Sequence, residues 1–155
     1  MRIQQLLVIV LAAGCGADSP APSAYVEGAT PDRLTMSDDT ANDLTITVSY
    51  DDHDGDLGGG IAEVHDCRAD TLVTMLPIPT IAPPNVVADH SHITGKLDLD
   101  VNDIGSVSSM PLPQMCADLG VTQLDTDTTR FCVILVDAAG HKGDGDCTAT
   151  ISLFQ

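Results

Sequence analysis

The segment that decides the fold class is LTITVSY, residues 44–50, which alternates strictly between apolar and polar side chains. Successive side chains of a β-strand point to opposite faces, so Leu44, Ile46, Val48 and Tyr50 are expected to share one face. The alternation therefore predicts a strand with one buried face and one exposed face.

Six other short apolar segments lie between Gly, Pro, Asn and Asp residues and are also predicted to be strands. They span residues 34–36, 61–67, 72–76, 93–101, 131–136 and 148–154. The segment 131–136 is apolar on both faces and should be a central strand, whereas 113–119 suits one or two helical turns. About seven short strands separated by turn residues favour an all-β, two-sheet sandwich. Its core must be aliphatic, because aromatic residues make up only 3% of the chain.

The beginning of the chain has the parts of an export signal: a basic start, an apolar run over residues 3–11, and small residues before Cys15. The apolar run is shorter than the roughly 20 residues that a permanent membrane-spanning helix needs. Residues 11–15, LAAGC, resemble the bacterial lipobox, whose cysteine carries diacylglycerol and becomes the first residue of the mature protein. The alternative is an ordinary signal peptide cleaved near Ala13, with an unmodified cysteine.

These features predict three parts: a signal peptide over residues 1–14, a lipidated cysteine with a flexible tether over 15–28, and a β-sandwich domain over 29–155. The tether is predicted from small residues and prolines. The residue after the cysteine is Gly16, and in this the chain resembles lipoproteins that are sent on to the outer membrane. The resemblance implies a cell-envelope protein whose acyl chains anchor it in that membrane.

The charge of the chain is strongly acidic, with 23 Asp and Glu against six Lys and Arg, giving a formal net charge of −17. Such a surface repels phosphates, so nucleic acid is excluded as a partner. Nearly all the acidic residues are Asp, which is a poor helix former and a good turn residue because its short carboxylate bonds the nearby backbone. This bias favours strands and loops, and it suits cations that prefer oxygen ligands.

Two stretches are similar to the immunoglobulin-like domains of bacterial surface lipoproteins. In residues 44–60 an alternating strand runs into the loop YDDHDGDLGGG, and in residues 131–153 the strand FCVILV ends in a D-x-x-G turn. The resemblance implies an immunoglobulin-like sandwich outside the cytoplasm. It implies no activity, because function has to be argued from a site.

In a seven-stranded sandwich of this kind, the loop after the second strand and the loop after the sixth lie at the same end. Both loops are rich in aspartate here. We expect a Ca²⁺ site where they meet, because closely spaced carboxylate oxygens are the ligands that Ca²⁺ prefers. The candidate ligands are Asp52, Asp54, Asp56, Asp137, Asp144 and Asp146.

The spacing of Asp52, Asp54, Asp56 and Glu63 also resembles the calcium loop of helix-loop-helix proteins. Leu57 stands where that loop needs glycine, and strands flank it, so this assignment is rejected. The alternative for the whole acidic end is a set of solvated turns without an ion, because Asp and Gly are ordinary turn residues.

Histidines are expected near the acidic end as well. His53, His141 and the pair in His90-Ser91-His92 offer nitrogen ligands for Zn²⁺, with exposed loop histidines as the alternative. His65 lies within a predicted strand and is expected to be structural.

Four cysteines follow Cys15, and an even number in an oxidising compartment predicts two disulfides. They are Cys67, Cys116, Cys132 and Cys147. Of the three possible pairings, we expect Cys116–Cys132, which closes a short local loop, and therefore Cys67–Cys147.

The expected function is a non-enzymatic module, tethered by lipid, that presents its loops to a protein or to the cell envelope. A metal-dependent hydrolase built on the Asp and His cluster is one alternative. A carbohydrate-binding module is another, although two Tyr and two Phe are few for the aromatic platform such a module needs. No catalytic residue is predicted, since no nucleophile motif such as G-x-S-x-G is present.

Overall fold

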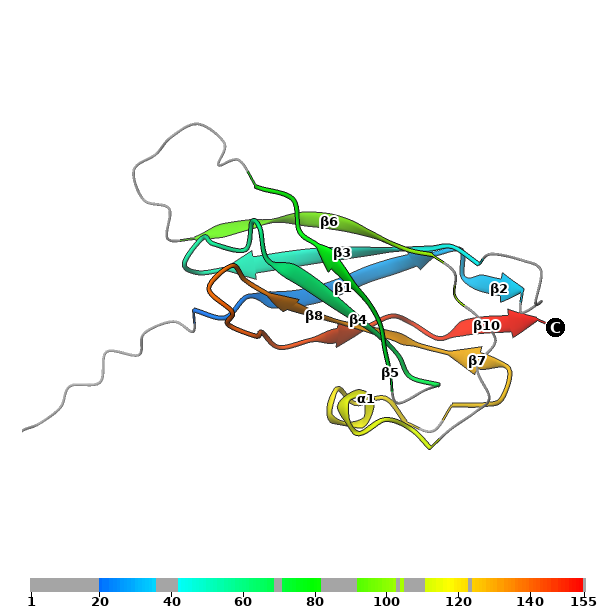
Figure 1. Ribbon diagram of the computed structural model, residues 1–155. Coiled ribbons are helices and arrows are strands. Elements are labelled where there is room, and N and C mark those ends of the chain that lie inside the picture. The colour runs from blue at the N-terminus through cyan, green and yellow to red at the C-terminus, as the bar shows by residue number, and fades with distance from the viewer. Residues whose placement is uncertain are drawn as a thin grey trace, which may run out of the picture.

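The regular secondary structure of the described residues is almost all β-strand, with one short helix, as the sequence predicts (Figure 1). The computed structural model describes residues 20–35, 42–68, 71–81, 92–102, 104, 111–122 and 124–154. The strands are β1 (Ser23–Thr30), β2 (Arg33–Thr35), β3 (Leu44–Asp52), β4 (Ile61–Asp66), β5 (Thr71–Pro77), β6 (Ile93–Val101), β7 (Thr128–Thr129), β8 (Phe131–Val136), β9 (Asp146–Cys147) and β10 (Ile151–Phe154). The helix is α1 (Gln114–Asp118).

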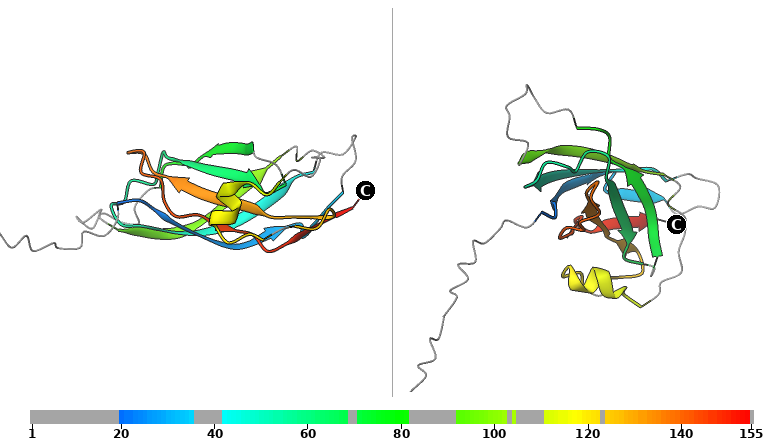
Figure 2. Two further views of the ribbon diagram at one scale, coloured as in Figure 1. Left: turned by 90° about the horizontal axis from the view of Figure 1, so that it is seen from below. Right: turned by 60° about the vertical axis from the view of Figure 1, so that its left-hand side comes forward.

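The strands form three sheets. Two are larger because they contain the long strands, and the third is small because its strands have at most four residues. One larger sheet has the order β1-β3-β6 and the other the order β5-β4-β8-β9, and every pairing in both is antiparallel. In the small sheet, β10 pairs with β2 in parallel and with β7 antiparallel. Figure 2 shows the two larger sheets as separate layers seen from two further directions.

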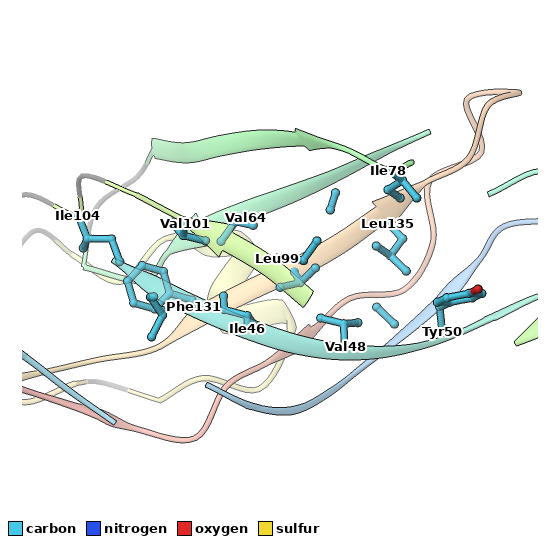
Figure 3. Packing of buried hydrophobic residues seen from close by; sticks show 14 of the residues in the cluster. Ile46, Val48, Tyr50, Val64, Ile78, Leu99, Val101, Ile104, Phe131 and Leu135 are labelled. Atoms are coloured by element: carbon cyan, nitrogen blue, oxygen red, sulfur yellow. The ribbon is translucent and has the colours of Figure 1, made fainter. Parts of the chain in front are cut away.

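The main core lies between the two larger sheets (Figure 3). Leu44, Ile46, Val48 and Tyr50 of β3 are all buried, at 6% exposure or less, so the alternation in the sequence did identify the core face. The opposite sheet contributes the inward side chains of β4 and β8, with Phe131 among them. Burial of these aliphatic side chains supplies the main driving force for folding.

A second, smaller core covers the outer face of the β5-β4-β8-β9 sheet. The four cysteines that follow Cys15 lie in it together with Val121, and the apolar residues around α1 pack against it. Strand β8 is therefore buried on both faces, which explains why its sequence is apolar throughout. In Figure 1 α1 lies beneath this sheet.

The expected disulfide pairing is wrong. Cys67 is bonded to Cys116, and Cys132 is bonded to Cys147, across Cα–Cα distances of 5.9 Å and 4.0 Å. The two bonds lie close together, because Sγ of Cys67 is 3.4 Å from Sγ of Cys132. The first bond ties the end of β4 to α1, and the second links the neighbouring strands β8 and β9.

The tight turn after β8 explains this correction. The chain reverses at once, so that Val136 bridges to Lys142 and the N–H of Gly143 donates to the carbonyl of Leu135 at 2.9 Å. The chain then runs back along β8, which brings Cys147 directly opposite Cys132. The sequence predicts the last long strand only from residue 148, which leaves Cys147 in the loop that follows residues 131–136.

The outer face of the β1-β3-β6 sheet is polar and internally hydrogen-bonded. The hydroxyl of Thr45 donates to Asp100 and that of Thr47 donates to Asp98, both at 2.8 Å. Further along, Ser49 donates to the carboxylate of Glu27. Opposite side chains of neighbouring strands thus form a ladder of hydroxyls and carboxylates.

The ordered domain begins earlier than expected. Strand β1 starts at Ser23 and pairs with β3 along its length, so a flexible tether reaching to residue 28 is wrong for residues 23–28. The predicted signal peptide and Cys15 lie outside the described residues. Within the part of the chain that the structure describes, no helix is long and apolar enough to cross a membrane.

Candidate metal centre

The β3–β4 loop and the β8–β9 loop meet at one end of the domain, as the sequence analysis expected (Figure 1). The N–H of Ala138 donates to the carbonyl of Asp56 at 3.1 Å, which joins the two loops directly. The loops also approach closely at Gly60, where a Cβ atom would lie 2.1 Å from the carbonyl oxygen of Val136. Glycine is therefore required at that position, and the contact holds the acidic segments together.

Asp52 is the most deeply buried acidic residue of this end, with no exposed surface. It is the last residue of β3 and continues the inward face of that strand. Its Oδ2 accepts a hydrogen bond from the N–H of Leu57 at 2.8 Å. Its Oδ1 is buried, and none of the described residues donates a hydrogen bond to it. A buried carboxylate oxygen without a partner costs free energy, so it requires an explanation.

Neighbouring carboxylates converge on Asp52. One oxygen from each of Asp52, Asp54 and Asp56 lies within 4.8 Å of the others, and Oδ1 of Asp56 is also buried without a partner among the described residues. Asp54 belongs to a second group at the same spacing, with Asp137 and His141. Four of the six predicted ligands are thus brought together.

Asp137 is held in place by His141. Its Oδ1 accepts a hydrogen bond from the backbone N–H of His141 at 2.7 Å, and its Oδ2 lies 2.9 Å from the ring Nδ1. The carboxylate is buried at the start of the β8–β9 loop. The histidine thereby fixes Asp137 beside Asp54, whose Oδ2 lies 3.9 Å from the same ring nitrogen.

The electrostatic environment disfavours the ionised carboxylates. Burial raises the pKa of Asp52 above its ordinary value, and the charges of Asp54 and Asp137 raise it further, although the N–H of Leu57 lowers it. Burial also raises the pKa of Asp56, with the same two neighbours adding to the effect. A bound cation would offset this repulsion, because its positive charge favours the ionised form of nearby carboxylates.

Asp144 and Asp146 are not part of this group. The carboxylate of Asp146 accepts hydrogen bonds from the N–H groups of Val26 and Cys147, both at 2.8 Å. The carbonyl of Asp144 accepts one from Ala24 at 3.4 Å. Both aspartates lie on the segment that runs back along β8, so the tight turn that changed the disulfides also removes them from the acidic end.

The histidines separate into different environments. His141 joins the carboxylate group, whereas His53 and His92 lie together beside Asp51, which the sequence analysis did not select as a ligand. His65 lies on β4 with its Nε2 3.6 Å from Oε2 of Glu63, which agrees with a structural role. His90 lies outside the described residues.

The group of Asp52, Asp54 and Asp56 offers only hard oxygen ligands. The β3–β4 loop that carries it turns at Gly55, whose φ is 78°, and a backbone hydrogen bond joins it to the β8–β9 loop. Such a set suits Ca²⁺, which takes six to eight oxygens with flexible geometry. No protein-family model matches the sequence, and neither a curated protein nor a solved structure shows significant similarity to the chain.

Proposed function

We propose that this protein is a lipid-anchored, immunoglobulin-like module outside the cytoplasm that binds Ca²⁺ where the β3–β4 and β8–β9 loops meet. Ca²⁺ would order these loops, and the ordered loops would contact a protein or the cell envelope. The observation that carries the proposal is the buried Oδ1 of Asp52, which has no donor among the described residues. One oxygen of the same carboxylate lies within 4.8 Å of carboxylate oxygens of Asp54 and Asp56.

Without an ion, the close approach of these carboxylates costs free energy. Three carboxylate oxygens within 4.8 Å of one another repel, and burial of Asp52 removes the water that would screen them. A calcium ion would satisfy the unpartnered oxygens of Asp52 and Asp56 at the same time. Asp54 would supply a third carboxylate to the six to eight oxygens that Ca²⁺ takes, while Asp137 adds negative charge from the second loop.

The order of the strands supports the immunoglobulin-like assignment. The order β1-β3-β6 agrees with strands A, B and E of such domains, and β5-β4-β8-β9 agrees with C′, C, F and G. In that scheme the two acidic loops are the B–C and F–G loops, which variable domains use for recognition. This correspondence supports an interaction role for the same end.

Two observations support the location. The sequence LAAGC at residues 11–15 is that expected for lipidation, and the domain has two buried disulfides, which are typical of proteins in oxidising compartments. Mass spectrometry of the protein purified from membranes tests this part. We expect an N-terminal Cys15 that carries acyl chains, and an unmodified N-terminus at another residue would contradict it.

Isothermal titration with Ca²⁺ tests the ion site. We expect saturable binding and a rise in melting temperature for the native protein, and loss of both in the double variant D52A/D54A. The matched control is Asp144→Ala, because Asp144 is exposed and lies outside the carboxylate group. Absence of binding by the native protein, or an equal loss in the control, would overturn the proposal.

A further inference from the structure

We propose a second metal site on the outer surface at the end of β3, formed by Asp51, His53 and His92 and selective for Zn²⁺ over Ca²⁺. It is separate from the carboxylate group, because adjacent side chains of a strand point to opposite faces. Asp52 points inward and is fully buried, whereas the side chain of Asp51 is 36% exposed.

The register of β3 and β6 brings the three residues together. The last pair of this antiparallel ladder is Asp52 with Ile93. His53 and His92 therefore lie one position beyond that pair, next to the ends of β3 and β6. Asp51 and His53 are two residues apart and therefore share the outer face. Residues from two distant parts of the sequence thus meet at one point on the surface.

The side chains are close enough to bind one ion. One ligand atom from each residue lies within 4.8 Å of the others. Nε2 of His92 is 2.7 Å and Nε2 of His53 is 3.8 Å from Oδ1 of Asp51. Ligand atoms around tetrahedral Zn²⁺ are about 3.4 Å apart, given metal–ligand distances near 2.1 Å. The side chains of His53 and His92 are 39% and 54% exposed, so they can rotate to reach that spacing.

The two imidazole rings are stacked on one another. The ring centroids of His53 and His92 are 5.0 Å apart and the rings are inclined by only 13°. Nε2 of each ring lies on the side of Oδ1 of Asp51, so both rings present a nitrogen atom to the same carboxylate.

The donor set determines which ion is expected. Two imidazole nitrogens and one carboxylate suit Zn²⁺ and similar transition ions, whereas Ca²⁺ takes oxygen ligands. Three protein ligands leave at least one coordination position for water or for a group from another molecule. The net charge of −17 also attracts cations to this surface.

The test is titration of the untagged protein with ZnCl₂ in chelator-free buffer, by calorimetry and by NMR of the histidine ring nitrogens, with and without saturating Ca²⁺. We expect one Zn²⁺ whose affinity Ca²⁺ does not reduce, and selective shifts of the His53 and His92 rings. His53→Gln and His92→Gln should each weaken binding by roughly tenfold or more, since each removes one of three ligands. His65→Gln on β4 should leave the affinity unchanged.

Two outcomes would overturn the proposal. One is the absence of saturable Zn²⁺ binding by the native protein. The other is binding that survives both His53→Gln and His92→Gln, or that is lost in His141→Gln instead, because Zn²⁺ would then occupy the carboxylate group. Melting temperatures without Zn²⁺ identify any variant that is unfolded, and the NMR shifts of the native protein then decide the location.

Discussion

Replacing Asp52 by Asn should change the stability of the protein in opposite directions with and without Ca²⁺. The amide keeps an oxygen that can accept the N–H of Leu57 but removes the buried negative charge. Two unit charges separated by 4.8 Å interact by about 0.9 kcal/mol in water and about 3.5 kcal/mol at an effective dielectric constant of 20. Without Ca²⁺ the variant should therefore be more stable than the native protein, by about 1–3 kcal/mol.

With Ca²⁺ the order should reverse. An ion present at 100 times its dissociation constant stabilises the native protein by about 2.7 kcal/mol, provided that it binds only the folded state. The variant loses a buried ligand oxygen and with it most of this gain. The predicted signature is a crossover: Asp52→Asn is the more stable protein in EDTA and the less stable one in excess Ca²⁺.

Urea unfolding followed by far-ultraviolet circular dichroism measures both conditions, since the chain has no tryptophan to serve as a fluorescence probe. Asp144→Asn is the control, because this exposed residue should shift neither curve appreciably. If Asp52→Asn were destabilised in EDTA, the carboxylate would have an unrecognised partner and the electrostatic argument would fail. If Ca²⁺ left the native curve unchanged, the ion site itself would be refuted.

Two further predictions concern stability. The double variant C67S/C116S removes a disulfide with a sequence separation of 49 and should lose about 4 kcal/mol of unfolding free energy. The double variant C132S/C147S removes one with a separation of 15 and should lose about 3 kcal/mol, because the loop that it closes is shorter. Urea midpoints measure both losses, and the reverse order would contradict the loop-entropy argument. Burial lowers the pKa of His65 below its ordinary value of 6.5. The unfolded chain therefore binds the proton more readily, and stability is lost as pH falls below 6.5 through the folded pKa. His65→Gln should reduce the loss of stability between about pH 7.5 and pH 5, and an unchanged acid sensitivity would disprove this role.

Strands with periodic sequences were predictable, and short strands fixed by tertiary contacts were not. Strand β3 alternates over its whole length, and β8 is apolar on both faces, so both were located from the pattern alone. Strand β1 was missed because prolines and small residues precede it and resemble a tether. Strands β7 and β9 have two residues each, too few for any periodicity, and form only because neighbouring strands supply their hydrogen bonds.

The candidate site was predicted in part for a similar reason. Asp52, Asp54, Asp56 and Asp137 could be expected at one end, because they follow recognisable strands directly. The positions of Asp144 and of the disulfide partners depend on how sharply the chain turns after β8. No pattern in the sequence predicts the sharpness of that turn. The contact between His53 and His92 depends on the β3–β6 register, which pairs Asp52 with Ile93 at the end of the ladder nearest to them.

The hydroxyl–carboxylate ladder on the outer face of the β1-β3-β6 sheet limits how this protein can recognise others. Thr45 and Thr47 already donate to Asp100 and Asp98, so a molecule that approached this surface would have to compete with existing hydrogen bonds. Such an exchange gains little net free energy in water. Recognition through this face is therefore disfavoured, and under the proposed function the choice of partner would fall to the end of the domain where the two acidic loops meet.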